Sequence, residues 1–72
     1  MKLEVGDKVR IVRGSYCNEP GIVRSISRPR DVEHDGKVVH LHGFVNVKLT
    51  GPGWRVEVAY LYETAEQKVE VV

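Results

Sequence analysis

The chain has few of the features that stabilise or anchor other small proteins. Its 72 residues include one cysteine, three prolines and one tryptophan. A single cysteine excludes an internal disulfide, and no Cys/His spacing is typical of a structural zinc site. No apolar run approaches the ~18 residues of a membrane span, and the first residues lack the apolar run of a signal peptide. These absences favour one soluble domain over residues 1–72, in a reducing, cytoplasmic setting.

A strong excess of charge of one sign is also lacking. The net charge is +1, although residues 1–30 hold seven Lys/Arg against three Asp/Glu (+4) and residues 31–72 hold four against seven (−3). Nucleic-acid-binding domains are usually more basic than this pI of about 7.9. The charge therefore permits nucleic acid as a partner without requiring it.

What the chain does contain begins with a strand, a turn and a second strand between residues 6 and 23. Val9 and Ile11 alternate with Lys8 and Arg10, which is the period of a half-buried strand. Residues 14–21 then concentrate Gly, Ser, Asn and Pro, the residues of turns. A second strand is expected to follow, over residues 21–27.

The next segment, residues 28–36, mixes charge with proline and ends in Asp35-Gly36. This composition predicts a long, solvated hairpin loop that closes in a tight turn. Every odd position from Val39 to Leu49 except Gly43 is apolar, which predicts one strand. Gly43 marks either a bulge or bend in that strand or a turn between two shorter strands.

The last third of the chain predicts a turn, a strand, a helical turn and a final strand. The turn is expected at residues 50–53, the strand at 54–58, the helical turn near 60–62 and the final strand at 68–72, paired with the first. Five short strands without a normal helix predict an all-β fold. A small, partly open barrel protects most of the strand edges in such a chain.

The opening stretch resembles the KOW motif of ribosomal proteins and transcription elongation factors, which are built on an SH3-like barrel. The residues that match are Gly6-Asp7, Val9, Ile11, Gly14, Tyr16, Gly21 and Val23. Asn18 departs from the glycine usual in the family, but asparagine also tolerates a left-handed backbone. Residues 56–63 resemble the strand, helical turn and exit that close such barrels. The resemblance implies a five-stranded SH3-like barrel that contacts RNA or proteins through its first hairpin loop.

A looser resemblance, which needs gaps, is to small barrel subunits docked on photosynthetic complexes. It rests on Lys8–Ile11, Ser15-Tyr16 and Asn18-Glu19. This resemblance implies docking on a larger complex.

Five arginines and several neighbouring side chains are the candidate contacts for RNA. Arginine suits bidentate phosphate contacts and stacking on bases, and aromatic side chains suit single-stranded RNA. Arg10 and Arg24 are expected to face each other across the first hairpin. The alternative is an ordinary solvated strand face. The candidate residues are Arg10, Arg13, Tyr16, Arg24, Arg28, Arg30, His40, His42, Phe44 and Lys48.

The spacing of His40 and His42 places both on one face of a strand, where they can approach a metal together with His34 or Cys17. Without a third ligand at a defined spacing, exposed strand histidines are the preferred interpretation. We therefore expect no metal and no cofactor.

No catalytic group stands out. Cys17 has no base or orienting partner in the sequence, so we expect a buried or half-buried small side chain there. Trp54 shares its phase with Val56 and Val58 and is expected in the core. Acidic residues 31–35 keep a loop soluble rather than catalyse proton transfer. The chain is therefore predicted to be a monomeric, non-catalytic binding module. Its partner is RNA or a ribonucleoprotein, or alternatively a protein complex on which it docks.

Overall fold

The computed structural model describes residues 2–53 and 55–72, which form two antiparallel sheets and one short helix. The strands are β1 (Lys8–Ile11), β2 (Pro20–Ser27), β3 (Arg30–His34), β4 (Lys37–Leu41), β5 (Phe44–Leu49), β6 (Glu57–Leu61) and β7 (Val69–Val71), and α1 is Ala65–Lys68. The fold is mainly β, as the sequence predicts. None of the described helices is long and apolar enough to cross a membrane. The expected core position of Trp54 lies outside the described residues.

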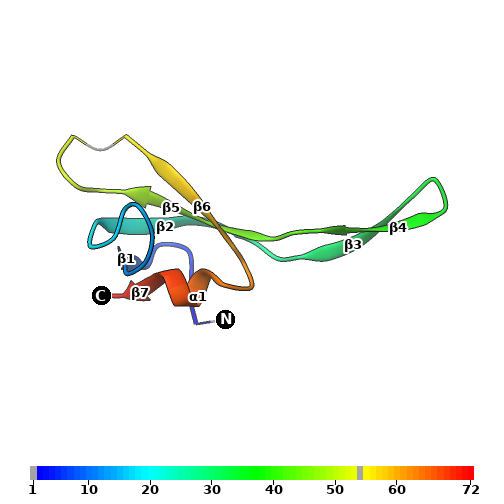
Figure 1. The fold of residues 1–72 in the computed structure, drawn as a ribbon, viewed down its shortest axis with the longest axis horizontal. Helices are drawn as coiled ribbons and strands as arrows, with labels where there is room; N and C mark the ends of the chain where they lie inside the picture. The colour runs from blue at the N-terminus through cyan, green and yellow to red at the C-terminus, as the bar shows by residue number, and fades with distance from the viewer. Residues whose placement is uncertain (1, 54) are drawn as a thin grey trace.

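The larger sheet has five strands in the order β6-β5-β2-β1-β7 (Figure 1). β7 pairs with β1, which confirms the predicted return of the carboxy-terminal strand to the first. The outer strands β6 and β7 do not pair with each other in the described part of the chain, so these pairings do not close a barrel.

The core lies on one face of this sheet because alternate strand residues point to the same side. Its buried residues are Leu3, Val9, Ile11, Val23, Val45, Val47, Leu49, Ala65 and Val69. Tyr16, Ile26, Val56, Val58, Tyr60 and Tyr62 pack against it while partly exposed. The alternation in β1 and β5 therefore predicts the buried side chains correctly.

Two local turn predictions are also confirmed. Asn18 has φ +73°, the left-handed conformation expected in the first loop. Asp35 and Gly36 have φ +52° and +75°, as a two-residue hairpin turn of the Asp-Gly type requires. Both outcomes depend only on local backbone preferences.

The smaller sheet consists of β3 and β4, a two-stranded ribbon that extends from one end of the body (Figure 1). We call β3, its turn and β4 the arm. The molecule measures 48 × 23 × 21 Å, so the arm accounts for its elongation. The predicted long loop over residues 28–36 is therefore wrong for residues 30–34, which form a strand.

The arm continues the β2–β5 pairing without a change of register. Ser27 pairs with Phe44 on one side of the interruption and Arg30 with Leu41 on the other, so two residues are skipped on each chain. A Cβ on Gly43 would meet the backbone of Arg28 and Pro29 at 2.6 and 2.5 Å. Gly43 therefore marks a close backbone approach between two shorter strands, and the single strand predicted for residues 39–49 is interrupted there.

The carboxy-terminal third differs from the sequence prediction in position. Tyr60 and Leu61 belong to β6, and the helical segment comes later, at α1. A short helical segment before the last strand is therefore confirmed, but its predicted position near residues 60–62 is wrong. In β6, Val58 and Tyr60 lie opposite Val47 and Val45, so packing against the core keeps this segment extended.

Candidate functional site

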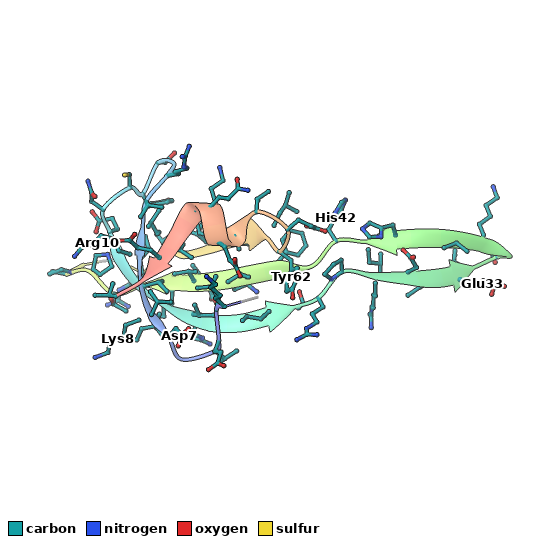
Figure 2. All side chains as sticks on the ribbon, turned by 90° about the horizontal axis from the view of Figure 1, so that it is seen from below. Asp7, Lys8, Arg10, Glu33, His42 and Tyr62 are labelled. Atoms are coloured by element: carbon teal, nitrogen blue, oxygen red, sulfur yellow. The ribbon has the colours of Figure 1, made fainter. Side chains whose placement is uncertain are left out.

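Eight of the ten predicted contact residues fall into two groups at opposite ends of the body. Arg10 lies on β1 opposite Pro20 and Glu70, and Arg13 lies in the loop that follows. Tyr16 in the same loop is half-buried and packs against the core. Figure 2 shows Arg10 at one end of the body and His42 at the other, where the arm begins. The structure therefore does not bring all ten candidates into one surface.

The expected juxtaposition of Arg10 and Arg24 is wrong. The register places Arg10 opposite Pro20. Arg24 lies farther along β2, at an irregularity in the β2–β5 pairing between Val23 and Ser25. Its side chain is exposed, and the register gives it no partner on β1 or β5. Lys48 lies on β5 between Ile22 and Glu57, away from the arm.

The second group lies where the arm joins the body. All of its side chains are exposed, and they come from the β2–β3 connection, from both strands of the arm, from the β4–β5 connection and from the start of β5. They are Arg28, Arg30, His40, His42 and Phe44. This junction and the arm beyond it form the candidate site.

The two faces of the arm differ in charge and polarity, because cross-strand partners share a face. One face, which we call the arm face, carries the pairs Arg30/Leu41, Val32/Val39 and His34/Lys37. The opposite face carries the pairs Asp31/His40 and Glu33/Val38. Basic and apolar side chains thus gather on the arm face, and both carboxylates of these pairs lie on the other.

The apolar residues of the arm face are not covered by the body. Leu41 and Val39 have the same phase as buried Val45, but they are 39% and 40% exposed. Both residues belong to β4, and the arm extends past the end of the body (Figure 1). On the opposite face, Val38 is 75% exposed. The alternation therefore predicts which residues share a face, whereas the length of the ribbon decides which of them are buried.

A further apolar pair lies beside the junction, on the outer face of the large sheet. Phe44 and Leu61 are cross-strand partners on β5 and β6, and they are 39% and 44% exposed. Phe44 was expected on an exposed face, and it is there. Leu61 was not singled out because its segment was predicted to be helical.

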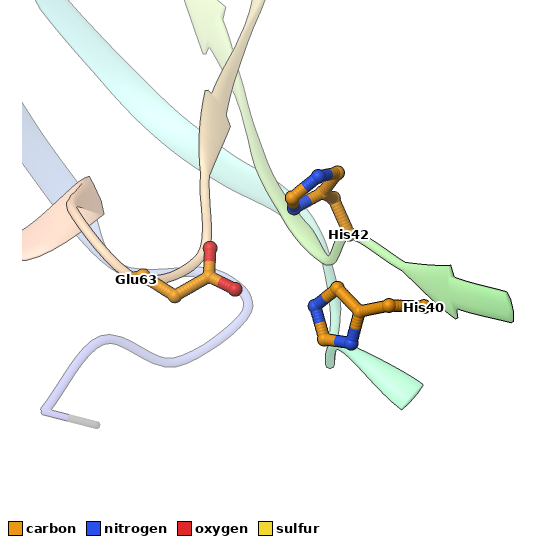
Figure 3. A group of neighbouring side chains, drawn as sticks. All are labelled: His40, His42 and Glu63. Carbon is orange, nitrogen blue, oxygen red and sulfur yellow. The ribbon is translucent and has the colours of Figure 1, made fainter. Parts of the chain in front are cut away.

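The junction also brings together two histidines and a glutamate (Figure 3). Extending the Phe44–Leu61 register by two residues places His42 opposite Glu63. The Tyr62 N–H donates to the Gly43 carbonyl at 2.9 Å, which holds the two chains together at this point. One side-chain ligand atom each of His40, His42 and Glu63 lies within 4.8 Å of the other two. All three residues are exposed.

His40 is oriented by a cross-strand partner. Its Nδ1 lies 2.8 Å from Oδ1 of Asp31, the residue opposite it on β3. A carboxylate oxygen accepts hydrogen bonds, so Nδ1 is the donor, and in the neutral ring Nε2 is then the nitrogen with the lone pair. The rings of His40 and His42 lie edge to face with centroids 5.2 Å apart.

Cys17 differs from the sequence expectation. It is exposed, and its thiol donates to the carbonyl of Val12 at 3.4 Å. The prediction of a buried or half-buried side chain is therefore wrong. The neighbouring Tyr16 packs against the core, so the two adjacent side chains of this loop differ in burial.

Sequence reasoning missed Glu63, Leu61 and the exposed Val38. For Glu63 no local signal exists, because its position beside His42 depends on the β5–β6 register. For Val38 and the arm, the charged residues 28–36 conceal the strand β3, so the length of the ribbon is not visible in the sequence.

Comparisons of the chain with protein-family models, with curated proteins and with solved structures find no match. The functional argument therefore rests on the arm and its junction.

Proposed function

We propose that the chain is a non-catalytic docking module whose arm binds a protein partner, and that its body is a partly open SH3-like barrel of the KOW type. Support for the barrel comes from the strand order β6-β5-β2-β1-β7 and from α1, which precedes the last strand. The arm is then an extension of the hairpin formed by β2 and β5.

The observation that carries the docking proposal is the uncovered apolar surface of the arm face. A two-stranded ribbon is marginal in water without a third strand or a packed face. Here Val39 and Leu41 remain about two-fifths exposed, and neither β3 nor β4 has a second strand partner in the described residues. Exposed apolar surface of this kind marks sites that a partner covers.

The charges on the arm face indicate what kind of partner fits. Arg30 lies at the base of the arm face and Lys37 at its tip, so basic groups flank Val39 and Leu41 on both sides. A complementary surface is apolar in the centre and carries carboxylates at both ends. The partner is therefore a protein with an apolar groove or sheet edge between acidic groups.

Site-specific photo-crosslinking in cells that make this protein tests the docking proposal. A photoreactive amino acid at Val39 samples the arm face, and the same group at Glu33 is the matched control on the opposite face. We expect a discrete protein adduct from position 39, unchanged by nuclease treatment, and little or none from position 33. Equal adducts from both faces, or an adduct removed by nuclease, would contradict the proposal.

RNA is the second candidate partner, and a specific observation favours it. Arg10, Arg13, Arg24, Arg28 and Arg30 are all exposed. Their exposed guanidinium groups suit bidentate contacts with phosphate. If RNA is the partner, affinity falls steeply with salt and with Arg13→Glu or Arg28→Glu. Tight partner binding that is unaffected by salt and by either substitution would exclude RNA as the partner.

A further inference from the structure

We propose that His40, His42 and Glu63 form a binding site for Zn²⁺ that ties the arm to the body. Two imidazoles and one carboxylate are a donor set that zinc accepts in proteins, with a water as the fourth ligand. The sequence suggests His34 or Cys17 as a third ligand, whereas in the structure the third ligand is Glu63, in the turn after β6. This site is independent of which partner the arm binds.

The backbone that carries the three ligands is well fixed. His42 and Glu63 are held opposite each other by the hydrogen bond from Tyr62 N–H to the Gly43 carbonyl. On its other side, Gly43 lies close to the backbone of Arg28 and Pro29, which fixes the β4–β5 connection against the β2–β3 connection. The ligands therefore need only side-chain rotation to converge.

Asp31 completes the arrangement in the way that partners of metal-binding histidines usually do. By accepting from Nδ1 of His40, it orients the ring and leaves Nε2 free to bind a cation. In Figure 3 one ring nitrogen of His40 lies on the side of Glu63 and the other lies away from it. Asp31 is thus a positioning residue for the site.

The distances require a small closure on binding. Ligand atoms bound at about 2.1 Å in tetrahedral geometry lie ~3.4 Å apart, against the present limit of 4.8 Å. All three side chains are exposed and can rotate by this amount. The bound ion would link His40 on β4 and His42 in the β4–β5 connection to Glu63 in the turn between β6 and α1. This link would restrict the angle between the arm and the body.

Titration of the metal-stripped chain with Zn²⁺ tests the proposal, with Co²⁺ as a spectroscopic substitute. We expect one equivalent of Zn²⁺ to bind, and Co²⁺ to give the visible absorption of a four-coordinate site. His42→Ala and Glu63→Gln should each weaken binding at least tenfold, and Asp31→Asn by about 10- to 100-fold. His34→Ala and Cys17→Ser are the matched controls, and both should stay within about twofold of the wild type.

Circular dichroism of each variant checks that the fold is retained, and amide shifts on the wild-type chain localise the ion without any variant. The expected shifts are centred on His40, His42 and Glu63. Absence of one-to-one binding, shifts centred elsewhere, or affinity lost with His34→Ala or Cys17→Ser rather than His42→Ala would overturn the proposal.

Discussion

Gly43 allows the strand pairing of the body to continue into the arm without a change of register. At this position the β4–β5 chain passes the opposite strand so closely that a Cβ would contact the backbone of Ser27, Arg28 and Pro29. Backbone atoms cannot rotate away as a side chain can. We expect Gly43→Ala to lower the free energy of unfolding by about 3 kcal/mol, measured by urea denaturation.

Gly14→Ala provides the matched comparison for this prediction. Gly14 has φ +99°, but nothing lies within 4 Å of a Cβ built there. Its substitution therefore adds backbone strain without a clash, which costs about 1–2 kcal/mol. If Gly43→Ala lowers the free energy of unfolding no more than Gly14→Ala does, the close backbone approach is not the reason that position 43 requires glycine.

Tyr60 gives the fold a dependence on alkaline pH. Partial burial and, to a smaller extent, the nearby Tyr16 raise the pKa of Tyr60 above its ordinary value of 10.0. The unfolded chain then loses this proton at a lower pH than the folded chain does. Stability contributed by neutral Tyr60 is therefore complete below pH ~10 and falls as the pH rises toward the folded-state pKa.

Urea denaturation between pH 8 and 11 measures this effect. Tyr60→Phe removes the titrating group and keeps the ring, so the variant should lose less stability than the wild type over the upper part of that range. Parallel pH profiles for the two proteins would show that Tyr60 does not couple ionisation to folding.

At the scale of secondary-structure elements, the sequence correctly predicts the features that depend on neighbouring residues alone. Alternation places Val9 and Ile11 in the core, and the Asp35-Gly36 pair makes a tight turn. β3 was missed because Arg30, Asp31 and Glu33 have the composition of a loop. Those charges are tolerated in a strand because the ribbon is solvated on both faces and needs no buried side.

The β5–β6 pairing explains the remaining errors in elements and in the candidate site. The run Tyr60, Leu61, Tyr62 has no alternation in hydrophobicity, so the sequence favours a helical turn there. Pairing with Phe44 and Val45 keeps it extended and delays the helix to α1. The same register sets Glu63 beside His42, a contact between residues far apart in sequence that no local pattern encodes.

At the scale of the whole molecule, the arm determines the shape but supplies none of the buried core. The radius of gyration is 13.8 Å, whereas a compact chain of 72 residues has about 11 Å. The buried hydrophobic residues all lie outside β3 and β4. The body should therefore fold without the arm.

Small-angle scattering of the full chain and of a variant without the arm tests this division. In the variant, Asn-Gly replaces residues 30–41 and joins Pro29 to His42, which are opposite each other in the continuous register. We expect a radius of gyration near 13.8 Å for the full chain and about 11 Å for the variant. The free energy of unfolding should change by less than about 1 kcal/mol, since no buried side chain is removed. A full chain that scatters as a compact particle would show that the arm folds back on the body. Its apolar face would then be covered from within, and the docking proposal would lose its basis.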